Sequence, residues 1–581
     1  MTKNSSDFYY LGEYEAASLC PLSLKNAPYI VAACAFKGDH HFARRVYKEY
    51  RKEFNERDLV FANFHLGISL TRTSHYHEAK EVFIENWRKR KSRKLSEIER
   101  FFIYQGLSFF RFFFSNHSSS LYFARVAEEE LLKKRSAPPL LFSLVNDLIA
   151  HNFFQLGRPA KGETFLKKAI KKTKEGELKI LNEEFKASLV IYKSQYSKDA
   201  EYHIKSLKKI LSKTSESNDY TRSELVLQIS KLFFLMGAYN DAREFLIKNF
   251  NTIYKNDNKR KVAKLNTLLA QLLLPKGQFI EAISLLKVAK SNLSQDVDFN
   301  LLAPILGIEK LVLESLGQNT QEQREQLERL LDKTDKGVLK QIHSREGKKP
   351  LFNEEDQLGI LFDKVCLRDS SVLDEIIDNE LLHLASMYFS PFEKKSNLVV
   401  HPKNIGIFLF SEDEVLYRPG KVSKNQYQFL KLLSTGPQTK EMLVRNIWGY
   451  SSYDPFRHDH LVYTLVRRLR VLLGPRKDWI QASEDQYTLE REVAVVLNSG
   501  TEKSNVLQVN KERILSSFPE DINFRQIQIL EGAINDFFSA YDVAEFFKTT
   551  RMTSYRDLDD LVKRDLLIKR GRGRGTRYVL R

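Results

Sequence analysis

The chain has 581 residues, of which 42% are hydrophobic and 29% are charged, and its formal net charge at pH 7 is +18. These values exclude a disordered chain and a protein built on one hydrophobic core, and they predict a folded protein of several domains. The positive excess favours a polyanionic partner, which is a nucleic acid or an acidic membrane surface.

The three cysteines, Cys20, Cys34 and Cys366, lie far apart and lack metal-ligand spacing. This pattern argues against a disulfide framework and a zinc site, and it is typical of a reducing compartment. The first twenty residues carry acidic and aromatic side chains instead of the basic and apolar regions of a signal peptide. The most apolar run, residues 101–114, is too short to span a bilayer. We therefore expect a cytoplasmic protein with no membrane partner.

From about residue 28 to about residue 335 the sequence has helical periodicity and few strand signals. The clearest unit places Gly277 between two helices whose facing positions are apolar or small: Leu269, Ala270, Leu273, Phe279, Ala282, Leu286 and Ala289. Similar sets surround Gly237 and Gly157, and residues 66–83 also fit. The small residues allow two antiparallel helices to approach closely, so the sequence predicts repeated helix pairs.

These spacings resemble the tetratricopeptide repeat (TPR), a helix-turn-helix unit of about 34 residues. The units here stand farther apart, and residues 101–132 and 308–331 match the pattern poorly, so we expect a degenerate TPR-like array over residues 1–335. The resemblance implies stacked helix pairs with a concave groove that binds a protein or peptide partner. A scaffold or dimerisation platform, which includes a homodimer, stays open as the alternative.

Residues 336–400 are expected to form a helical connector. Residues 344–350 have the composition of an exposed loop. Residues 372–389 have the apolar spacing of one amphipathic helix, which Pro391 ends.

At Ile405 the periodicity changes from helical to strand-like. The sequence predicts strands and helices in this order: strands at 405–410 and 415–417, a helix from Lys424, a helix at 440–448 capped by Thr439, a third helix at 458–473, and strands at 479–482 and 486–489. This order resembles the winged-helix DNA-binding domain of OmpR-type response regulators, and we place the domain at residues 401–497.

The family resemblance extends to the end of the third helix, where Arg468-Leu469-Arg470 matches a common Arg-Leu-Arg. It fails at the closing hairpin, which has Gln486-Tyr487-Thr488-Leu489 where the family commonly has Gly-Tyr-Arg-Leu. No receiver-like strand and helix pattern with an acidic pocket precedes the domain. Input from the repeat array is therefore expected in place of aspartyl phosphorylation.

The third helix has one apolar stripe, and its other side carries cations, hydroxyls and an aromatic ring. The resemblance implies that this helix lies in the major groove of DNA, with four groove-facing side chains: His460, Tyr463, Thr464 and Arg467. Arg468 and Arg470 either bind phosphates or pack within the domain. His458 and His460 flank Asp459, but one short cluster without further ligands does not predict a metal site.

Residues 505–581 predict a second compact module, after a polar linker. Helices are expected from a cap at Asn523, at 539–547 and from a cap at Thr553 or Ser554, and two final strands flank a glycine-arginine tip. This pattern resembles a second winged helix, of the kind found in DeoR-type modules, and implies DNA contacts by Arg572, Arg574 and Arg577. Three carboxylates on or beside its last helix oppose DNA binding, so protein docking stays open: Asp557, Asp559 and Asp560.

No catalytic motif is found, so neither an enzyme nor a cofactor is expected. The sequence predicts a mostly α protein, with an N-terminal TPR-like α-solenoid followed by two small α+β winged-helix domains. The predicted function is that of a transcriptional regulator that binds double-stranded DNA and senses or recruits a partner through the array. The alternatives are a protein-interaction scaffold, whose winged helices dock proteins, and an RNA-binding protein.

Overall fold

The computed structural model describes residues 4–134, 136–216, 219–254, 258–331, 355–390, 392, 394–483, 485–497, 526, 529, 539–546, 549–564, 566–571 and 576–580. The chain forms two compact units. Met1–Ser390 and Lys395–Val495 make up the first unit, and Pro391–Lys394 and Val496–Arg581 make up the second. Within the described residues, no helix is long and apolar enough to cross a membrane.

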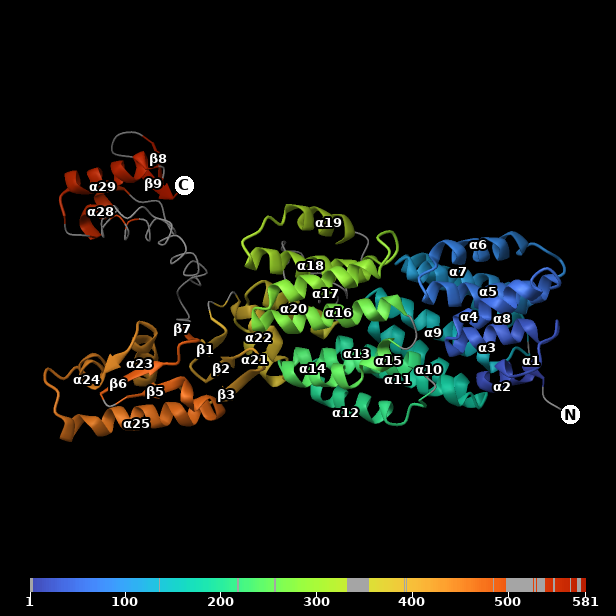
Figure 1. The fold of residues 1–581 in the computed structure, drawn as a ribbon, viewed down its shortest axis with the longest axis horizontal. Coiled ribbons are helices and arrows are strands. Elements are labelled where there is room, and N and C mark those ends of the chain that lie inside the picture. The colour runs from blue at the N-terminus through green and yellow to red at the C-terminus, as the bar shows by residue number, and fades with distance from the viewer. Residues whose placement is uncertain are drawn as a thin grey trace. The chain divides into compact units, whose positions relative to one another are not determined.

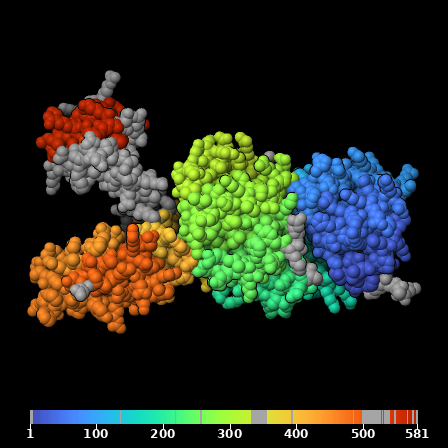
Figure 2. All heavy atoms as spheres, viewed as in Figure 1, coloured from blue at the N-terminus to red at the C-terminus, as the bar shows by residue number. Residues whose placement is uncertain are grey.

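The first unit begins with a helical repeat array, in which short turns join successive helices (Figure 1). Its helices are α1 (Ser5–Tyr10), α2 (Tyr14–Ser18), α3 (Ala27–Lys37), α4 (His40–Tyr50), α5 (Glu56–Arg72), α6 (Tyr76–Lys89), α7 (Glu97–Phe113), α8 (His117–Lys133), α9 (Pro139–Gln155), α10 (Pro159–Glu175), α11 (Lys179–Tyr196), α12 (Ala200–Leu211), α13 (Asp219–Leu235), α14 (Tyr239–Lys248), α15 (Phe250–Tyr254), α16 (Lys259–Leu273), the short 3₁₀ helix η1 (Leu274–Lys276), α17 (Phe279–Ser291), α18 (Phe299–Ser315) and α19 (Gln321–Leu331). The predicted array of helix pairs is confirmed. Figure 2 shows the surface atoms of the array, coloured from blue near the N-terminus to yellow-green near residue 300.

The turns of the predicted repeat units have left-handed backbone at their glycines. Gly157, Gly237 and Gly277 have φ angles of 70°, 79° and 65°, which glycine adopts without strain. Helices α7 and α8 also form a packed pair, although residues 101–132 match the repeat pattern poorly. The left-handed residue of their turn is Ser115, with a φ of 54°. This helix pair is therefore a repeat unit whose turn lacks the glycine that marks the other units.

Small residues bring α5, α6 and α7 together around one aromatic ring. A Cβ atom placed on Gly67 of α5 would lie 2.5 Å from the ring of Phe83 on α6. A Cβ on Gly106 of α7 would lie 2.8 Å from the same ring. Both glycines therefore make room for Phe83, which is 2% exposed.

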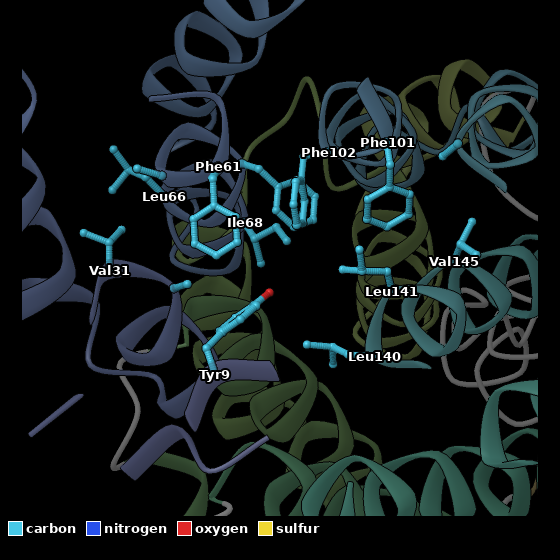
Figure 3. Close-up of a cluster of buried hydrophobic side chains, with 14 of the residues drawn as sticks. Tyr9, Val31, Phe61, Leu66, Ile68, Phe101, Phe102, Leu140, Leu141 and Val145 are labelled. Carbon is cyan, nitrogen blue, oxygen red and sulfur yellow. The ribbon is translucent and has the colours of Figure 1, made fainter. Parts of the chain in front are cut away.

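The core of the first helices is rich in aromatic side chains. The ring of Tyr9 packs edge-on against Phe61, with 5.2 Å between ring centroids, and Phe61 packs edge-on against Phe102 (Figure 3). The Tyr9 hydroxyl and the Nε2 atom of His65 are 2.9 Å apart. Burial lowers the pKa of His65 well below its ordinary value, so this imidazole is neutral in the core.

The connector consists of α20 (Gln357–Cys366), α21 (Val372–Asp378) and α22 (Leu382–Phe389). The predicted single helix over residues 372–389 is wrong. Glu380 adopts a φ of 55°, and the N–H of Leu381 donates to the carbonyl of Ile376, which ends α21 in a Schellman-type cap. The predicted loop at residues 344–350 lies outside the described residues.

A strand-containing module, called here the first C-terminal module, completes the first unit. Its elements are β1 (Ser396–Val400), β2 (Gly406–Phe410), β3 (Val415–Pro419), α23 (Lys424–Ser434), β4 (Gln438–Thr439), α24 (Lys440–Trp448), α25 (Pro455–Leu473), the 3₁₀ helix η3 (Gly474–Trp479), β5 (Ile480–Ala482), β6 (Gln486–Leu489) and β7 (Val493–Leu497). One sheet has the order β3-β2-β1-β7 and the other β4-β6-β5. The predicted order is confirmed, but three strands were not predicted from the sequence: β1, β4 and β7.

The described part of the second unit contains α28 (Ala540–Phe546), α29 (Arg551–Lys563), β8 (Leu567–Arg570) and β9 (Arg577–Leu580). The two strands pair antiparallel, and Val543, Leu558 and Tyr578 belong to its small core. The predicted cap at Thr553 or Ser554 is wrong, because Thr550 caps α29 by accepting from the N–H of Thr553. Of the helix predicted from Asn523 the structure describes Gln526 and Ile529, which are both buried, and the tip with Arg572 and Arg574 lies outside the described residues.

Candidate DNA-binding surface and array cavity

Helix α25 is held in the first C-terminal module by its first turn and by one apolar face. The Asp454 side chain caps the helix by accepting from the N–H of Phe456, and Pro455 occupies the first helical position. The buried face packs into the module through six residues: His458, Val462, Leu465, Val466, Leu469 and Leu473. This anchorage leaves the opposite face of a rigid helix free to contact another molecule.

The opposite face of α25 is exposed along its length. His460, Tyr463, Thr464 and Arg467 are exposed and share one face, because they are spaced three and four residues apart. Arg468 is exposed beside them. Among the described residues neither arginine has an ion-pair partner, so both guanidinium groups are available to bind an anion.

Arg470 has a different environment from Arg467. It is half-buried, and its Nη2 atom donates a 2.7 Å hydrogen bond to the carbonyl of Ile480 at the start of β5. Of the two alternatives open for this residue, the structure shows packing within the module. Arg470 therefore joins the end of α25 to the β5–β6 hairpin.

The acidic residue within the candidate surface is paired inside the module. Asp459 accepts a hydrogen bond from Tyr453 and lies 2.9 Å from the ammonium of Lys440 on α24. The hydrogen bond from Tyr453 contributes most to lowering the pKa of Asp459 below its ordinary value. Because Lys440 balances this carboxylate, Asp459 adds little repulsion for a polyanion.

His458, the neighbour of Asp459, is also engaged internally. Its Nδ1 atom accepts from the N–H of Asp454 at 2.9 Å, and its ring stacks on Tyr450 with 4.5 Å between centroids. In the part of the chain that the structure describes, no three His, Cys, Asp or Glu side chains gather as metal ligands would.

In the second unit, the three carboxylates that oppose DNA binding have local partners or are buried. Asp559 lies 3.0 Å from Lys563, and Asp560 lies 2.8 Å from Arg564, each within α29. Asp557 is 7% exposed. Arg577 of the predicted wing is exposed and forms a 3.1 Å ion pair with Asp542 of α28.

A cavity of about 420 Å³ lies inside the repeat array. Its lining comes from the array and from the connector helices α20 and α22, and it combines aromatic rings with charges of both signs. Its polar lining residues include Arg72, Glu184, Tyr192, Glu224 and Lys261. The sequence analysis identified none of them, because they come from four helices spread over about 190 residues.

A buried ion pair joins distant parts of the array beside this cavity. Asp298, whose side chain is fully buried, lies 2.7 Å from the guanidinium of Arg260. The same carboxylate accepts a 2.8 Å hydrogen bond from Tyr76 on α6. Arg260 also lies over the ring of Phe113, 4.9 Å from its centroid. These contacts hold the early helices of the array against the later ones.

Burial changes the ionisation of the groups that line the cavity. Burial lowers the pKa of Lys261 to about 7, although its ammonium donates to the Tyr220 carbonyl and to the Ser223 hydroxyl, both at 2.6 Å. Burial raises the pKa of Glu184, while Arg72 opposes that rise. An ion that entered the cavity would therefore interact strongly with both residues, since water screens them little.

Among the residues that the structure describes, Arg72 and Glu184 form none of the short ion pairs that other cavity charges form. Lys264 pairs with Glu224 at 3.2 Å, and His151 pairs with Asp147 at 3.1 Å. Within the described chain, Arg72 instead lies over the ring of Tyr220 at 4.8 Å, and no carboxylate pairs with it. A ligand with a negative and a positive group would satisfy both side chains.

No protein-family model and no curated protein matches the chain. Among solved structures, it is similar to NprR in complex with its cognate peptide NprX, at 14% identity over 53% of this chain and 97% of that chain, with a TM-score of 0.38. It is similar to a Rap protein complexed with competence and sporulation factor, at 13% identity over 63% and 95% of the chains, with a TM-score of 0.42. It is also similar to a chain of the Saccharomyces cerevisiae separase–securin complex, at 13% identity over 82% of this chain and 38% of that chain, with a TM-score of 0.34.

Proposed function

We propose that this chain is a transcriptional regulator that binds double-stranded DNA, and that its helical array binds a peptide or protein partner. The observation that carries the proposal is the exposed face of α25, on which His460, Tyr463, Thr464 and Arg467 follow one another. The module around it has the order of strands and helices expected for an OmpR-type winged helix. The proposal assigns the chain no catalytic activity.

The chemistry of this face suits the major groove, which admits an α-helix. Arg467 has the planar fork that binds the O6 and N7 atoms of guanine, and Arg468 is placed to bind a phosphate. A formal net charge of +18 favours association with a polyanion. In the second unit, Arg577 is the described residue of the wing that would add a phosphate contact.

The partner of the array is assigned by the chemistry of the cavity. A volume of about 420 Å³ lies within the range of ligand-binding sites, about 300–1,000 Å³. A short peptide supplies a carboxylate for Arg72, an ammonium group for Glu184 and apolar side chains for the aromatic lining. An array selected for stability alone would fill this space with apolar side chains, since buried charges are costly to desolvate.

The test is DNA binding by the full-length chain over a series of salt concentrations. The proposal predicts a preferred set of genomic fragments, with affinity that falls by about 0.9 log units per log unit of salt for each phosphate neutralised. Footprints on those fragments also report the oligomeric state, because a dimer protects two half-sites about 34–36 Å apart. Equal affinity for all duplexes, matched by an equally basic control protein, would refute the proposal.

The alternative function, a scaffold whose modules dock proteins, is favoured by one feature of the same surface. Phe456 is 99% exposed and Tyr463 is 65% exposed, and exposed aromatic side chains are typical anchors of protein interfaces. A Phe456→Ala variant distinguishes the two functions. A scaffold loses its captured protein with this substitution and shows no preferred DNA fragment, whereas a regulator retains sequence-selective binding to DNA.

A further inference from the structure

The hairpin of β2 and β3 is bonded to a turn of the repeat array. The N–H of Val415 donates to the carbonyl of Gly237 at 2.9 Å, and the N–H of Asn240 donates to the carbonyl of Asp413 at 3.2 Å. The carboxylate of Asp413 lies 3.1 Å from the ammonium of Lys276. The hairpin is thus joined to the array by backbone hydrogen bonds, as a neighbouring strand would be, and by an ion pair.

The fit at this turn depends on the absence of a side chain. Gly237 has a φ of 79°, and a Cβ atom there would lie 2.8 Å from the Cβ of Val415. Any side chain would therefore push the hairpin away from the α13–α14 turn. Gly277, in the next repeat turn, has a similar φ of 65° but nothing within 4 Å of its Cβ position.

The same hairpin holds the C-terminal end of α25. Arg418 on β3 donates from Nε to the carbonyl of Leu472 at 3.3 Å. Glu414, in the hairpin turn, lies 3.0 Å from Arg476, which follows α25. The guanidinium of Arg418 also lies 2.8 Å from the Cβ position of Gly474, so the end of α25 is packed tightly against this hairpin.

The array cavity is connected to both sides of this junction. Helix α13 lines the cavity with Glu224, Gln228 and Leu235, and Leu235 precedes Gly237 by two residues. Over these residues the helix extends about 1.5 Å per residue, so one rigid element joins the cavity to the hairpin.

The second connection runs through α22. Leu384 lines the cavity, and His383 beside it forms a 3.0 Å hydrogen bond with Tyr239, the first residue of α14. At the end of α22, the ring of Phe389 packs on Phe408 of β2, with 5.4 Å between centroids.

We propose that occupancy of the array cavity controls the position of α25 through the β2–β3 hairpin, with α13 and α22 as the connecting elements. The inference rests on the proposed function, since it supplies the regulation of that DNA-binding surface. A ligand that shifts α13 or α22 changes the contacts of the hairpin with Gly237 and Phe389, and the hairpin carries the end of α25 with it. Packed helices move as units in such transitions, and the coupling between two sites typically changes affinity by about 5- to 150-fold.

The first experiment fills the cavity by substitution in the full-length chain. Ser188 lines the cavity on α11, and Ser284 is exposed on α17 away from it, so Ser188→Trp and Ser284→Trp are a matched pair. Ile191→Phe is a second, milder cavity variant. Hydrogen exchange is measured at the amides of Val415 and Asn240.

The proposal expects the exchange rates of these two amides to change by about threefold or more in both cavity variants, while the Ser284→Trp variant matches the wild type. If the exchange rates at Val415 and Asn240 change no more in the cavity variants than in Ser284→Trp, the proposal is wrong. The measurement needs no DNA, so it stands or fails separately from the proposed function.

The second experiment asks whether the hairpin contact is the route. Gly237→Ala and Gly277→Ala impose similar backbone strain, but only the first displaces Val415. The proposal expects Ser188→Trp to change the affinity for DNA by about 5- to 150-fold. This change should persist in the Gly277→Ala background and disappear in the Gly237→Ala background. An effect that survives Gly237→Ala overturns the proposed route. If no variant binds DNA but the junction amides respond to the cavity, the coupling stands and the proposed function fails.

Discussion

The carboxylate of Asp298 lies 2.7 Å from the guanidinium of Arg260 and also accepts a hydrogen bond from Tyr76, a residue 222 positions earlier in the chain. This contact joins α6 and α16 to the residue that precedes α18, beside the cavity that Arg260 lines. Because the Asp298 side chain is fully buried, the pair is screened little by water and each partner depends on the other.

Substitution of Asp298 by asparagine should destabilise the array strongly. Asparagine retains an oxygen for Tyr76 but leaves the charge of Arg260 without its partner, and breaking a buried pair in this way costs about 3–5 kcal/mol. Guanidinium unfolding of the full-length chain measures the change. Glu201→Gln, which removes one partner of an exposed pair on α12, is the control and should leave the midpoint unchanged. Equal midpoints for the two variants would contradict this role of Asp298.

Gly67→Ala should destabilise the chain, although alanine is normally the better helix former. The added methyl group would meet the ring of Phe83 at 2.5 Å, and overpacking of this kind costs about 1–3 kcal/mol. Phe83→Leu makes room for the methyl group, so the double variant should be more stable than the sum of the two single changes predicts. Strict additivity in denaturant unfolding would show that the two positions are not in contact.

Arg467→Gln should weaken binding to the preferred DNA by about 5- to 150-fold, which corresponds to about 1–3 kcal/mol for one arginine contact to a base pair. Discrimination against substitution of the contacted base pair should fall with it. Fluorescence anisotropy measures the affinity. Arg445→Gln on α24 is the control, because that arginine is also exposed in the same module but pairs with Glu441 at 3.2 Å. Equal losses for both variants would mean that α25 is not the reading helix.

Lys261 should make the stability of the array depend on pH. Its pKa is about 7 in the folded chain and about 10.4 in the unfolded chain, so below pH 7 both states are protonated and the burial penalty is complete. As pH rises above 7, the folded state releases this proton first, and the free energy of unfolding increases by at most about 1.4 kcal/mol per pH unit until about pH 10.4.

The Lys261→Met variant lacks this proton, so the difference in unfolding free energy between wild type and variant should rise from pH 7 to pH 9.5. Lys264→Met removes a neighbouring cation of α16, one that pairs with Glu224, and serves as the control. If the difference in unfolding free energy between wild type and Lys261→Met stays constant over this range, the lowered pKa of Lys261 is contradicted.

Local sequence patterns determined the helix pairs and the order of the first C-terminal module. Glycine at positions 157, 237 and 277 specifies left-handed turns, and apolar spacing specifies which face of each helix is buried. The exposed face of α25 followed from the same spacing, since its apolar stripe must enter a core. The α7–α8 pair matched the repeat pattern poorly, because Ser115 takes the place of the glycine in its turn.

Only the tertiary structure decided what the repeat pattern encloses. Arg72, Glu184 and Lys261 belong to different helices, and nothing in the local sequence of any one of them marks a cavity. The docking of the hairpin at Gly237 is equally hidden, because its hydrogen bonds use backbone groups that every residue carries, and a left-handed turn alone already accounts for the glycine. The periodicity of apolar residues predicts which face of a helix is buried. The element that packs against that face depends on the curvature of the whole array, which all of its contacts determine together.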